Sequence, residues 1–380
     1  MKINLDNAST TKVDPEVVKT MKPYFTKHFG NASSIHFLGL EAKKALEESR
    51  KIIAEIINAD PKEIIFTSGG TESNNLALKG MVFSNPNKHI ITTKIEHPCI
   101  MESCKWLEKQ GTRITYLDVD PEGFVNLEQL EKEITQDTIL VSIIHGNNEI
   151  GTIQNLEKIG EICQKHNTPL HTDACQSFTK IELDVKKQNL SLVTLNAHKI
   201  HGPKGIGALY VKKGIRLTPL LHGGGHENKL RSGTENIPAI VGFAKAVQLG
   251  MDKKHNQHMS KLRDELIKEL LKIPDSKLNG PKGNKRLSNN VNISFKYIEG
   301  ESIGGLLNAE YITSSTGSAC SSKSLEPSHV LLAIGLDHED AHGSLRLTLS
   351  RFNTQKEIDS VIKEIPPIIK KLRKMSPLRR

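Results

Sequence analysis

The chain reads Asn196-Ala197-His198-Lys199-Ile200-His201-Gly202-Pro203-Lys204-Gly205-Ile206-Gly207 just past the middle of its 380 residues. An apolar run over residues 191–195 leads into this stretch and another over 208–211 leaves it, which predicts a strand, a turn and a second strand. Lys199 then lies at a strand end. Packing that removes a lysine from water lowers its amine pKa and makes it nucleophilic at neutral pH, as a Schiff-base lysine requires. The alternative is a surface lysine in a glycine turn, and the rest of the chain decides against it.

Short apolar runs alternate with amphipathic helical patterns before this turn. The predicted strands cover residues 63–67, 89–93, 113–117, 139–144 and 169–172. The predicted helices cover residues 15–25, 38–58, 72–82, 99–109, 127–135 and 156–166. This alternation is typical of an α/β fold with a mostly parallel sheet between helices. In such sheets, ligands bind at the carboxyl ends of the strands.

Polar residues follow the predicted strands at this edge. They are Ser68 to Thr71, His97, Asn148, Asp173, Gln176 and Lys199. The first group belongs to Thr67-Ser68-Gly69-Gly70-Thr71-Glu72, a glycine turn between a strand and a helix, where free N–H groups and the helix dipole favour a phosphate. The motif alone is equally compatible with an ordinary helix cap. It matches neither the P-loop nor the dinucleotide-binding fingerprint.

The last third of the chain predicts a smaller α+β domain. A helical pattern over residues 239–271 weakens near 253–256, where we place the domain boundary. The predicted large domain covers residues 14–253, and the small domain combines residues 1–13 with 254–380. The small domain is expected to contain strands at 290–295 and 345–349 and helices at 303–308, 328–334 and 354–375, the last with a capping box of Thr354 and Glu357.

Composition excludes several classes of protein. The hydrophobic fraction is 37%, which is ordinary for a globular chain, and no apolar run is long enough to span a bilayer. The first thirty residues contain no signal-peptide pattern. The formal net charge is +9, partly from the basic tail over residues 370–380. Since no nucleic-acid-binding module accompanies that tail, we expect a solvated helix end and no direct nucleic-acid binding.

The five cysteines point to a reducing compartment. They are Cys99, Cys104, Cys163, Cys175 and Cys320. Their number is odd and no C-x-x-C pair occurs, so we expect neither a disulfide framework nor a metal site, and a cytoplasmic location.

The polar residues at the strand ends suit pyridoxal phosphate. A lysine forms an imine with it, an aspartate keeps its pyridine nitrogen protonated so that the ring accepts electrons, and a flat side chain stacks on the ring. Lys199, Asp173 and His97 have these chemistries.

Several motifs strengthen this interpretation through a family resemblance. They are Leu5-Asp6-Asn7-Ala8-Ser9-Thr10-Thr11, Gly30-Asn31-Ala32-Ser33-Ser34, Thr67-Ser68-Gly69-Gly70-Thr71-Glu72-Ser73-Asn74, Asn147-Asn148-Glu149-Ile150-Gly151, His198-Lys199 with Gly202-Pro203-Lys204-Gly205, and Arg231-Ser232-Gly233-Thr234. Together they resemble the cysteine desulfurases of the NifS/IscS type, which are fold-type-I pyridoxal phosphate enzymes of the aspartate aminotransferase superfamily. The resemblance extends from residue 3 to about residue 375.

The resemblance implies roles for individual residues. Lys199 would hold the cofactor as an imine and act as acid and base, Asp173 would pair with the pyridine nitrogen, and His97 would stack on the ring and assist proton transfer. Arg346 would clamp the substrate carboxylate, with Asn31 supporting that end of the substrate.

The remaining implied cofactor contacts come from both protomers of a homodimer. They are Thr71, Glu72, Asn148, Gln176, Asn196 and His198, together with Thr234 from the neighbouring protomer. Asn148 and Gln176 would contact the phenolate side of the ring, and the Thr71 and His198 side chains the phosphate. Asn196 stands where many relatives have a serine, and its amide can also donate to the phosphate.

Cys320 is the implied nucleophile. It would take the sulfur of L-cysteine as a persulfide and leave L-alanine. A loop of small polar residues, Thr316-Gly317-Ser318-Ala319-Cys320-Ser321-Ser322, surrounds it and argues against a core thiol. The other four cysteines fall in predicted helices or at strand ends, where a core position is expected.

The sequence therefore predicts a homodimeric L-cysteine desulfurase, a sulfur transferase. It would deliver persulfide sulfur to an acceptor such as an iron–sulfur scaffold or a tRNA-thiolation protein. The alternatives are a selenocysteine lyase or a cystine or cysteine lyase of the same fold, or a non-catalytic sulfur-carrier scaffold. A cystine lyase would not need Cys320.

Overall fold

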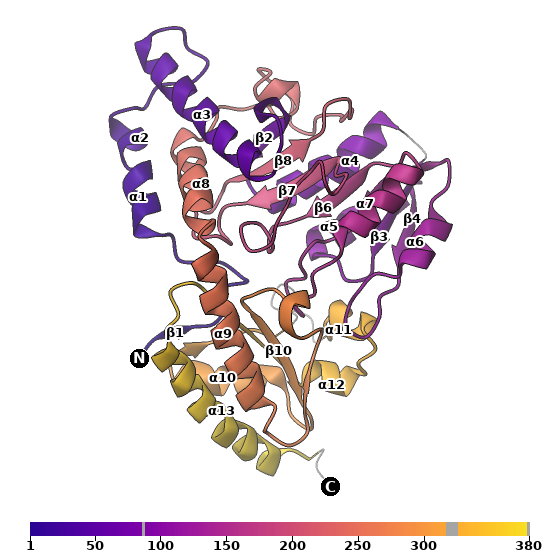
Figure 1. The fold of residues 1–380 in the computed structure, drawn as a ribbon, viewed down its shortest axis with the longest axis vertical. Coiled ribbons are helices and arrows are strands. Elements are labelled where there is room, and N and C mark those ends of the chain that lie inside the picture. Colours follow the sequence, from indigo (N-terminus) through magenta and orange to yellow (C-terminus); the bar gives the residue numbers. More distant parts are fainter. Residues whose placement is uncertain (86–87, 317–325, 378–380) are drawn as a thin grey trace.

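A computed structural model describes residues 1–85, 88–316 and 326–377, and its centre is a seven-stranded sheet (Figure 1). The strands in spatial order are β2 (Ile64–Thr67), β8 (Gly207–Val211), β7 (Leu192–Asn196), β6 (Leu170–Asp173), β5 (Thr138–Ser142), β3 (His89–Thr93) and β4 (Arg113–Leu117). Strand β8 is antiparallel to both of its neighbours, while the pairs from β7 to β4 are parallel. The predicted α/β fold with a mostly parallel sheet is confirmed.

The strands are stable because their apolar side chains are buried on both faces of the sheet. Successive side chains of a strand point to opposite faces. Ile64 and Phe66 of β2 accordingly join one core cluster, while Ile65 between them joins another. Continuous burial of this kind explains why the strands are apolar runs rather than alternating patterns.

Helices cover both faces of the sheet (Figure 1). The helices of this part are α1 (Pro15–Met21), α2 (Pro23–Thr26), α3 (Phe37–Ile56), α4 (Gly70–Ser84), α5 (Pro98–Lys109), α6 (Leu127–Glu133), α7 (Leu156–Lys165) and α8 (Ile237–Gly250). Helices α4 and α5 share a core with Ile65, and α3 and α8 share the core of Ile64 and Phe66. The seven strands begin and end within two residues of their predicted positions.

The rest of the chain forms a second, smaller unit. Its elements are α9 (Lys253–Leu270), β9 (Ser276–Leu278), β10 (Asn290–Phe295), α10 (Gly300–Ala309), β11 (Ile312–Thr313), α11 (His329–Ala333), α12 (His338–His342), β12 (Ser344–Thr348) and α13 (Gln355–Met375). The sheet order β12-β10-β9 is antiparallel. The expected capping box of Thr354 and Glu357 is present at the start of α13.

The amino-terminal arm belongs to this smaller unit. Strand β1 (Ile3–Asn4) pairs in parallel with β11. Ile3 and Leu5 lie in the same core cluster as apolar residues of α9, β10 and α13.

Two predicted helices are divided. The pattern over residues 239–271 is two helices, α8 and α9, because Asp252 accepts a hydrogen bond from Lys254 N and caps a new helix. The helix predicted over 15–25 ends at Met21, and α2 starts at Pro23 because a proline without an N–H suits the first position of a helix.

Candidate active site

A pocket of about 390 Å³ opens at the carboxyl ends of β2, β3, β5, β6 and β7. Residues from the strand ends line it together with the amino-terminal arm and Arg346 of β12. The lining residues that the following argument uses are Ala8, Ser9, Thr71, Asn74, His97, Cys99, Asn148, Glu149, Asp173, Cys175, Gln176, Asn196, His198, Lys199, Ser328 and Arg346. Its volume is in the range of ordinary ligand sites.

The glycine turn before α4 makes one wall of the pocket. Gly69 has a φ of 153°, and α4 begins after it with no side chain capping its first turn. The first N–H groups of a helix have no partner inside the helix, so they are available to an anion here. Gly207, at the start of the antiparallel strand β8, packs against this turn, and a Cβ there would lie 2.7 Å from Gly69 Cα.

Lys199 follows β7, and the amino-terminal arm holds its side chain. Its Nζ donates hydrogen bonds to the carbonyl oxygens of Ala8 and of Ser9, the latter at 2.7 Å. The arm is thus part of the site although it is almost 200 residues away in the sequence.

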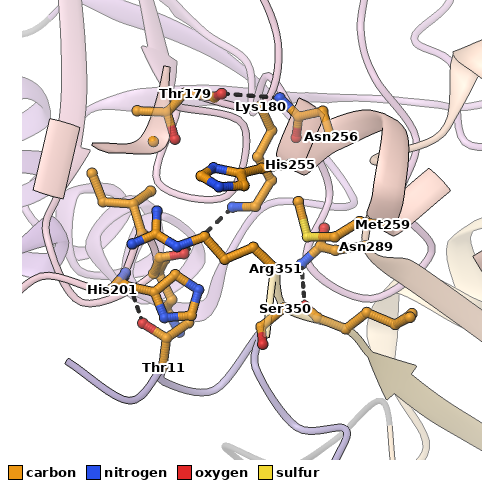
Figure 2. Close-up of a pocket in the computed structure, with 14 residues that line it drawn as sticks. Thr11, Thr179, Lys180, His201, His255, Asn256, Met259, Asn289, Ser350 and Arg351 are labelled. Carbon is orange, nitrogen blue, oxygen red and sulfur yellow. Dashed lines mark hydrogen bonds between the residues drawn. The ribbon is translucent and has the colours of Figure 1, made fainter. Parts of the chain in front are cut away.

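A buried lysine supports the main chain of Lys199 from the other side. Lys180 Nζ donates to the carbonyl oxygens of Gln176 at 2.9 Å and of Lys199 at 3.4 Å. Burial, and then the charge of Lys199, lower the pKa of Lys180 to about 8. Lys180 lies in a second cavity of about 30 Å³, shared with His201 and Arg351 (Figure 2).

Asp173 ends β6 as a buried carboxylate. It is 5% exposed, and it accepts hydrogen bonds from Asn74 Nδ2 at 2.7 Å and from Cys175 N at 2.9 Å. Among the described residues, no lysine, arginine or histidine forms an ion pair with it. Since a buried carboxylate is costly without a positive partner, the pocket is suited to a ligand that brings a cationic group.

His97 precedes α5 and caps it. Its Nδ1 accepts from Cys99 N at 3.2 Å and lies 3.0 Å from Cys99 Sγ. Burial lowers the pKa of His97, partly opposed by the charge of Asp173. The ring is therefore neutral near neutral pH. Burial, followed by the charge of Lys199, lowers the pKa of His198 to about 4.

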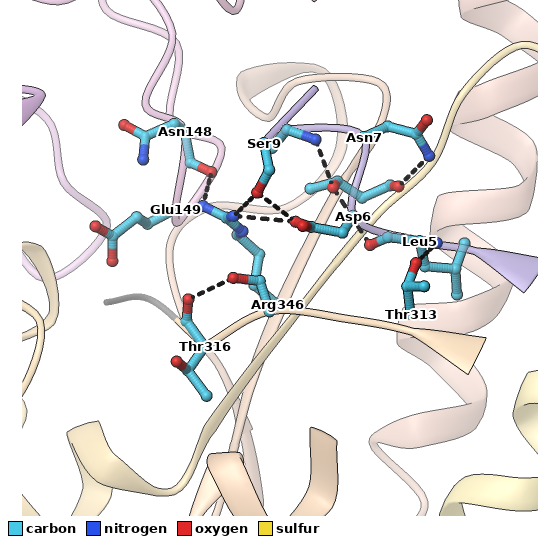
Figure 3. A network of polar contacts seen from close by, with 12 residues as sticks. Leu5, Asp6, Asn7, Ser9, Asn148, Glu149, Thr313, Thr316 and Arg346 are labelled. Atoms are coloured by element: carbon cyan, nitrogen blue, oxygen red, sulfur yellow. Dashed lines mark hydrogen bonds and ion pairs between the residues drawn. The ribbon is translucent and has the colours of Figure 1, made fainter. Parts of the chain in front are cut away.

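Arg346 reaches the pocket from the smaller unit (Figure 3). Its guanidinium donates to Asn148 O at 3.2 Å, and to Asp6 Oδ1 and Ser9 Oγ at 3.3 Å each. Nε is buried and has no hydrogen-bond partner among the described residues. An arginine with a donor left over in a pocket is suited to a carboxylate ligand.

Two buried acids are near the pocket, and one of them, Glu149, lines it. Burial raises the pKa of Glu96 to about 8, and its Oε1 accepts from Thr93 Oγ1 and Ile144 N at 2.7 and 2.8 Å. Burial raises the pKa of Glu149 to about 7, and its Oε2 accepts from Ser328 Oγ at 2.5 Å.

Most of the predicted site residues lie together in this pocket. Those that line it are Thr71, His97, Asn148, Asp173, Gln176, Asn196, His198, Lys199 and Arg346. Three do not line it in this chain: Glu72 pairs with Arg231 at 3.0 Å, and Thr234 and Asn31 are exposed. Cys320 lies outside the described residues.

Sequence reasoning missed other lining residues. Asn74 could have been found, because it lies one helical turn after Thr71 and so shares its face of α4. Cys175 is buried as expected, although it also lines the pocket, whereas Cys99 is half-buried and lines the pocket, so the core position expected for Cys99 is wrong. Cys104 and Cys163 lie in the core as expected. The sequence around Cys99 did not predict its place in the pocket, because the packing of its helix against the sheet determines which face of the helix lines the pocket.

The comparisons with known proteins agree with this geometry. The profile of the family described as aminotransferase class-V matches residues 3–361. The chain therefore belongs to the class-V aminotransferase family. The protein named cysteine desulfurase IscS from Methanosarcina thermophila is 52% identical, over 99% of this chain and 94% of its own length. Cysteine desulfurase IscS 1 from Archaeoglobus fulgidus is 50% identical over 99% of both chains. Within its family, this chain falls among the cysteine desulfurases.

Solved structures give the same result. A NifS-like protein superposes with a TM-score of 0.92 at 39% identity, covering 98% of this chain and all of the other. A structure titled SspA in complex with cysteine has a TM-score of 0.84 at 38% identity, covering 93% of this chain and all of the other. Among the described residues, no helix has the length and apolar character needed to cross a membrane.

Proposed function

We propose that this cysteine desulfurase binds pyridoxal phosphate in the pocket at the strand ends and passes the sulfur of L-cysteine to Cys320. The observation that carries the proposal is the meeting of Lys199, Asp173, His97 and Arg346 in one pocket. These groups come from four separate segments of the chain.

The residues present fit the cofactor. The buried Asp173 carboxylate has no cationic partner among the described residues, and a pyridinium nitrogen would provide one. The uncapped start of α4, with Thr71, is suited to the phosphate, and His198 and Asn196 would also donate to it. His97 would stack on the ring. When bound, the cofactor supplies an electron sink to the carbons of the amino acid.

The phenolate side of the cofactor would meet amides. Asn148 and Gln176 line the pocket, and the Gln176 amide already donates to Ala8 O at 2.9 Å. Glu72 does not line the pocket, and we propose that it acts indirectly: its ion pair with Arg231 anchors the segment that carries Thr234.

L-cysteine is the substrate that the pocket supports. The free Nε of the Arg346 guanidinium would donate to the substrate carboxylate. Lys199, held against the amino-terminal arm, would move the proton at the substrate carbons. The relative solved with cysteine is in accord with this substrate. Asn31 is exposed in one chain, so a contact with substrate would require a partner protomer.

The sulfur step balances without an added oxidant. The Cys320 thiolate attacks the substrate sulfur, the carbon–sulfur bond breaks, and the carbon takes up a proton. L-cysteine and one thiol become L-alanine and one persulfide.

A homodimer would complete the site. Thr234 is exposed and absent from the pocket of its own chain, as expected of a residue that serves a neighbour. Large apolar side chains are also exposed around α2 and the start of α3: Phe25 62%, Phe29 62%, Ile35 94%, Phe37 70% and Leu40 56%. So many exposed apolar groups in one short segment are typical of a subunit contact.

We also retain two proposals on organisation and delivery. A large domain over 14–253 and a small domain of 1–13 with 254–380 are in accord with the separate core clusters. Persulfide sulfur would go to an iron–sulfur scaffold or a tRNA-thiolation protein in the cytoplasm. The four described cysteines are free thiols, as a reducing compartment requires.

The test is turnover of L-cysteine with a reductant, counting alanine, sulfide and pyruvate. We expect the wild-type protein to make alanine and sulfide in equal amounts. Cys320→Ala should keep its yellow cofactor and make neither product, while Cys104→Ala, which loses a core thiol, should stay active. Pyruvate in place of alanine, or full activity of Cys320→Ala, would indicate a lyase instead. Activity confined to selenocysteine would indicate a selenocysteine lyase, and an absence of turnover would indicate a scaffold.

A further inference from the structure

Cys99 lies in the pocket, within a hydrogen-bonded chain that joins two other groups lining it, Asp173 and His97. Asn74 Nδ2 donates to Asp173 Oδ2 at 2.7 Å and to Cys99 Sγ at 3.1 Å. Cys99 Sγ lies 3.0 Å from His97 Nδ1. The chain therefore runs from Asp173 through Asn74 and Cys99 to His97.

The directions of these bonds follow from Asp173. Its carboxylate only accepts, so the Asn74 side chain must present its NH₂ group to it, and the second amide proton is directed to Cys99 Sγ. The sulfur then accepts one bond, and its own proton is free to go to His97 Nδ1. The backbone N–H of Cys99 also points to that nitrogen, at the longer distance of 3.2 Å, so the thiol is the nearer of its two donors.

The protonation states agree with this direction. Burial, with the charge of Asp173 as the next cause, raises the pKa of the Cys99 thiol to about 12, so the thiol keeps its proton. Burial lowers the pKa of His97, so its ring is neutral. Since the thiol is not ionised, Cys99 is also a poor acceptor of sulfur, although it lies in the pocket.

We propose that Cys99 is a positioning residue whose thiol donates to His97 Nδ1 and thereby keeps the imidazole proton on Nε2. No described residue hydrogen-bonds to that second nitrogen, which leaves it available to the cofactor and substrate. Asn74 supports the arrangement, because its amide fixes the sulfur with a lone pair toward Asn74 Nδ2 and the proton toward His97. The reaction in which His97 takes part rests on the proposed function, but the tautomer does not.

The first test measures the tautomer of His97 by ¹⁵N NMR of histidine-labelled protein without substrate. The His97 signals are assigned by their absence from the spectrum of His97→Gln. Wild-type protein should show an unprotonated Nδ1 and a protonated Nε2. Cys99→Ala should show a mixture of both tautomers and a higher His97 pKa. Cys99→Ser should restore the wild-type pattern, because a hydroxyl also donates. The control, Cys104→Ala, removes a core thiol from the same helix and should leave the pattern unchanged.

The second test is the pH profile of L-cysteine turnover by the cofactor-loaded protein. Besides Cys99, the charged or titratable groups that interact with His97 are Asp173, His198, Lys199, His329 and Arg346, and these five are retained in the variants. We expect Cys99→Ala to lose about 3- to 10-fold in kcat, the effect of one hydrogen bond, with KM unchanged and the acid limb shifted to higher pH. Cys99→Ser should remain close to wild type.

One result would overturn the proposal outright. If Cys99→Ala keeps a single Nε2-protonated tautomer and an unshifted pH profile, the backbone N–H of residue 99 suffices and the thiol has no positioning role. Because the tautomer is read without substrate, an inactive wild-type protein would contradict the proposed function and leave this test intact. Rapid alkylation of Cys99 at neutral pH would likewise contradict a protonated thiol.

Discussion

The Arg346 guanidinium makes three hydrogen bonds at the pocket and has one nitrogen without a partner among the described residues. Its Nη atoms are occupied by Asn148, Asp6 and Ser9, while Nε has no partner among the described residues. Arg346→Lys would keep the charge but lose the planar fork that binds a carboxylate through two parallel bonds. We expect kcat/KM for L-cysteine to fall about 10- to 100-fold, mainly through KM, with the cofactor retained.

Steady-state kinetics with visible absorption spectra would check this prediction. Arg351→Lys is a matched control, because Arg351 pairs with Asp14 beside the second cavity and does not line the substrate pocket. If Arg346→Lys loses its cofactor at unchanged KM, the arginine supports the fold of the pocket instead of the substrate.

Glu96 predicts a pH dependence of stability. Its pKa is about 8 in the folded protein, against 4.5 as the reference value. The folded state therefore binds a proton that the unfolded state releases, so the free energy of unfolding falls as pH rises from about 4.5 to about 8, by about 1.4 kcal/mol per pKa unit at most. Glu96→Gln is neutral in both states, so it should lack this fall and be more stable than wild type by a few kcal/mol at about pH 8.5.

Urea unfolding at about pH 5 and about pH 8.5 would measure the effect. Glu310→Gln, at an exposed position, controls for the loss of one carboxylate. Parallel changes in wild type and Glu96→Gln between the two pH values would show that Glu96 is ionised in the folded protein.

Single residues were predictable where the chain itself placed them at strand ends. Asp173 and Lys199 each follow an apolar run, and the carboxyl ends of parallel strands meet at one edge. Cys99 was not found, because its role depends on which face of α5 turns toward Asp173. Helix periodicity alone does not settle that orientation.

At the scale of elements, the backbone of β8 packs closely against the turn before α4. A Cβ on Gly207 would lie 2.7 Å from Gly69 Cα and 2.7 Å from Leu195 O, both main-chain atoms that cannot rotate away. We expect Gly207→Ala to destabilise the protein by about 1–3 kcal/mol, and to weaken retention of the cofactor because the displaced turn is the proposed binding site of the phosphate. Thermal unfolding and dialysis against cofactor-free buffer would measure the two effects.

The control for this change is Gly305→Ala. Gly305 lies inside α10, and a Cβ there would meet nothing within 4 Å. Alanine should stabilise that helix by about 0.5–1 kcal/mol. A Gly207→Ala protein as stable as wild type would mean that β8 and the turn separate easily.

The positions of the longer elements could be predicted from the sequence, but the shortest strands could not. The strands of the large sheet were found from their apolar runs, since both faces of that sheet are buried. The short strands β9 and β11 were missed, because three residues and two residues carry too little pattern. Long-range pairing, and not local propensity, makes them strands.

On the scale of the whole molecule, the exposed apolar segment around α2 and α3 predicts the state of assembly. Phe37 is 70% exposed in one chain. If this segment is the subunit contact, Phe37→Asp should give a monomer by size-exclusion chromatography with light scattering, because an unpaired charge would be buried in the contact. The same variant should lose cofactor more readily, since Thr234 of a neighbour would no longer reach the site.

Tyr311→Asp is the control for this variant. Tyr311 is 64% exposed and lies in the smaller unit, away from that segment. It should leave the assembly unchanged. A dimer that survives Phe37→Asp would place the contact elsewhere on the surface.

The overall architecture could be predicted from the order of the elements, but the long-range contacts that complete the pocket could not. Strands and helices that alternate along the chain define the sheet and the edge where ligands bind. The sequence contains no sign that the arm at Ala8 and Ser9 meets Lys199, or that Arg346 reaches Asn148. These contacts join segments that only the complete fold brings together.

The amino-terminal arm has a consequence for the newly made chain. Ribosomes release the amino terminus first. Ile3 nevertheless pairs with Ile312, and Asn7 donates to the carbonyl of Thr348, 341 residues further on. The amino-terminal arm must therefore wait for residues translated much later before it can settle against Lys199. We expect the cofactor to be captured only after Thr348 has left the ribosome, so that chains which stall before that point remain colourless.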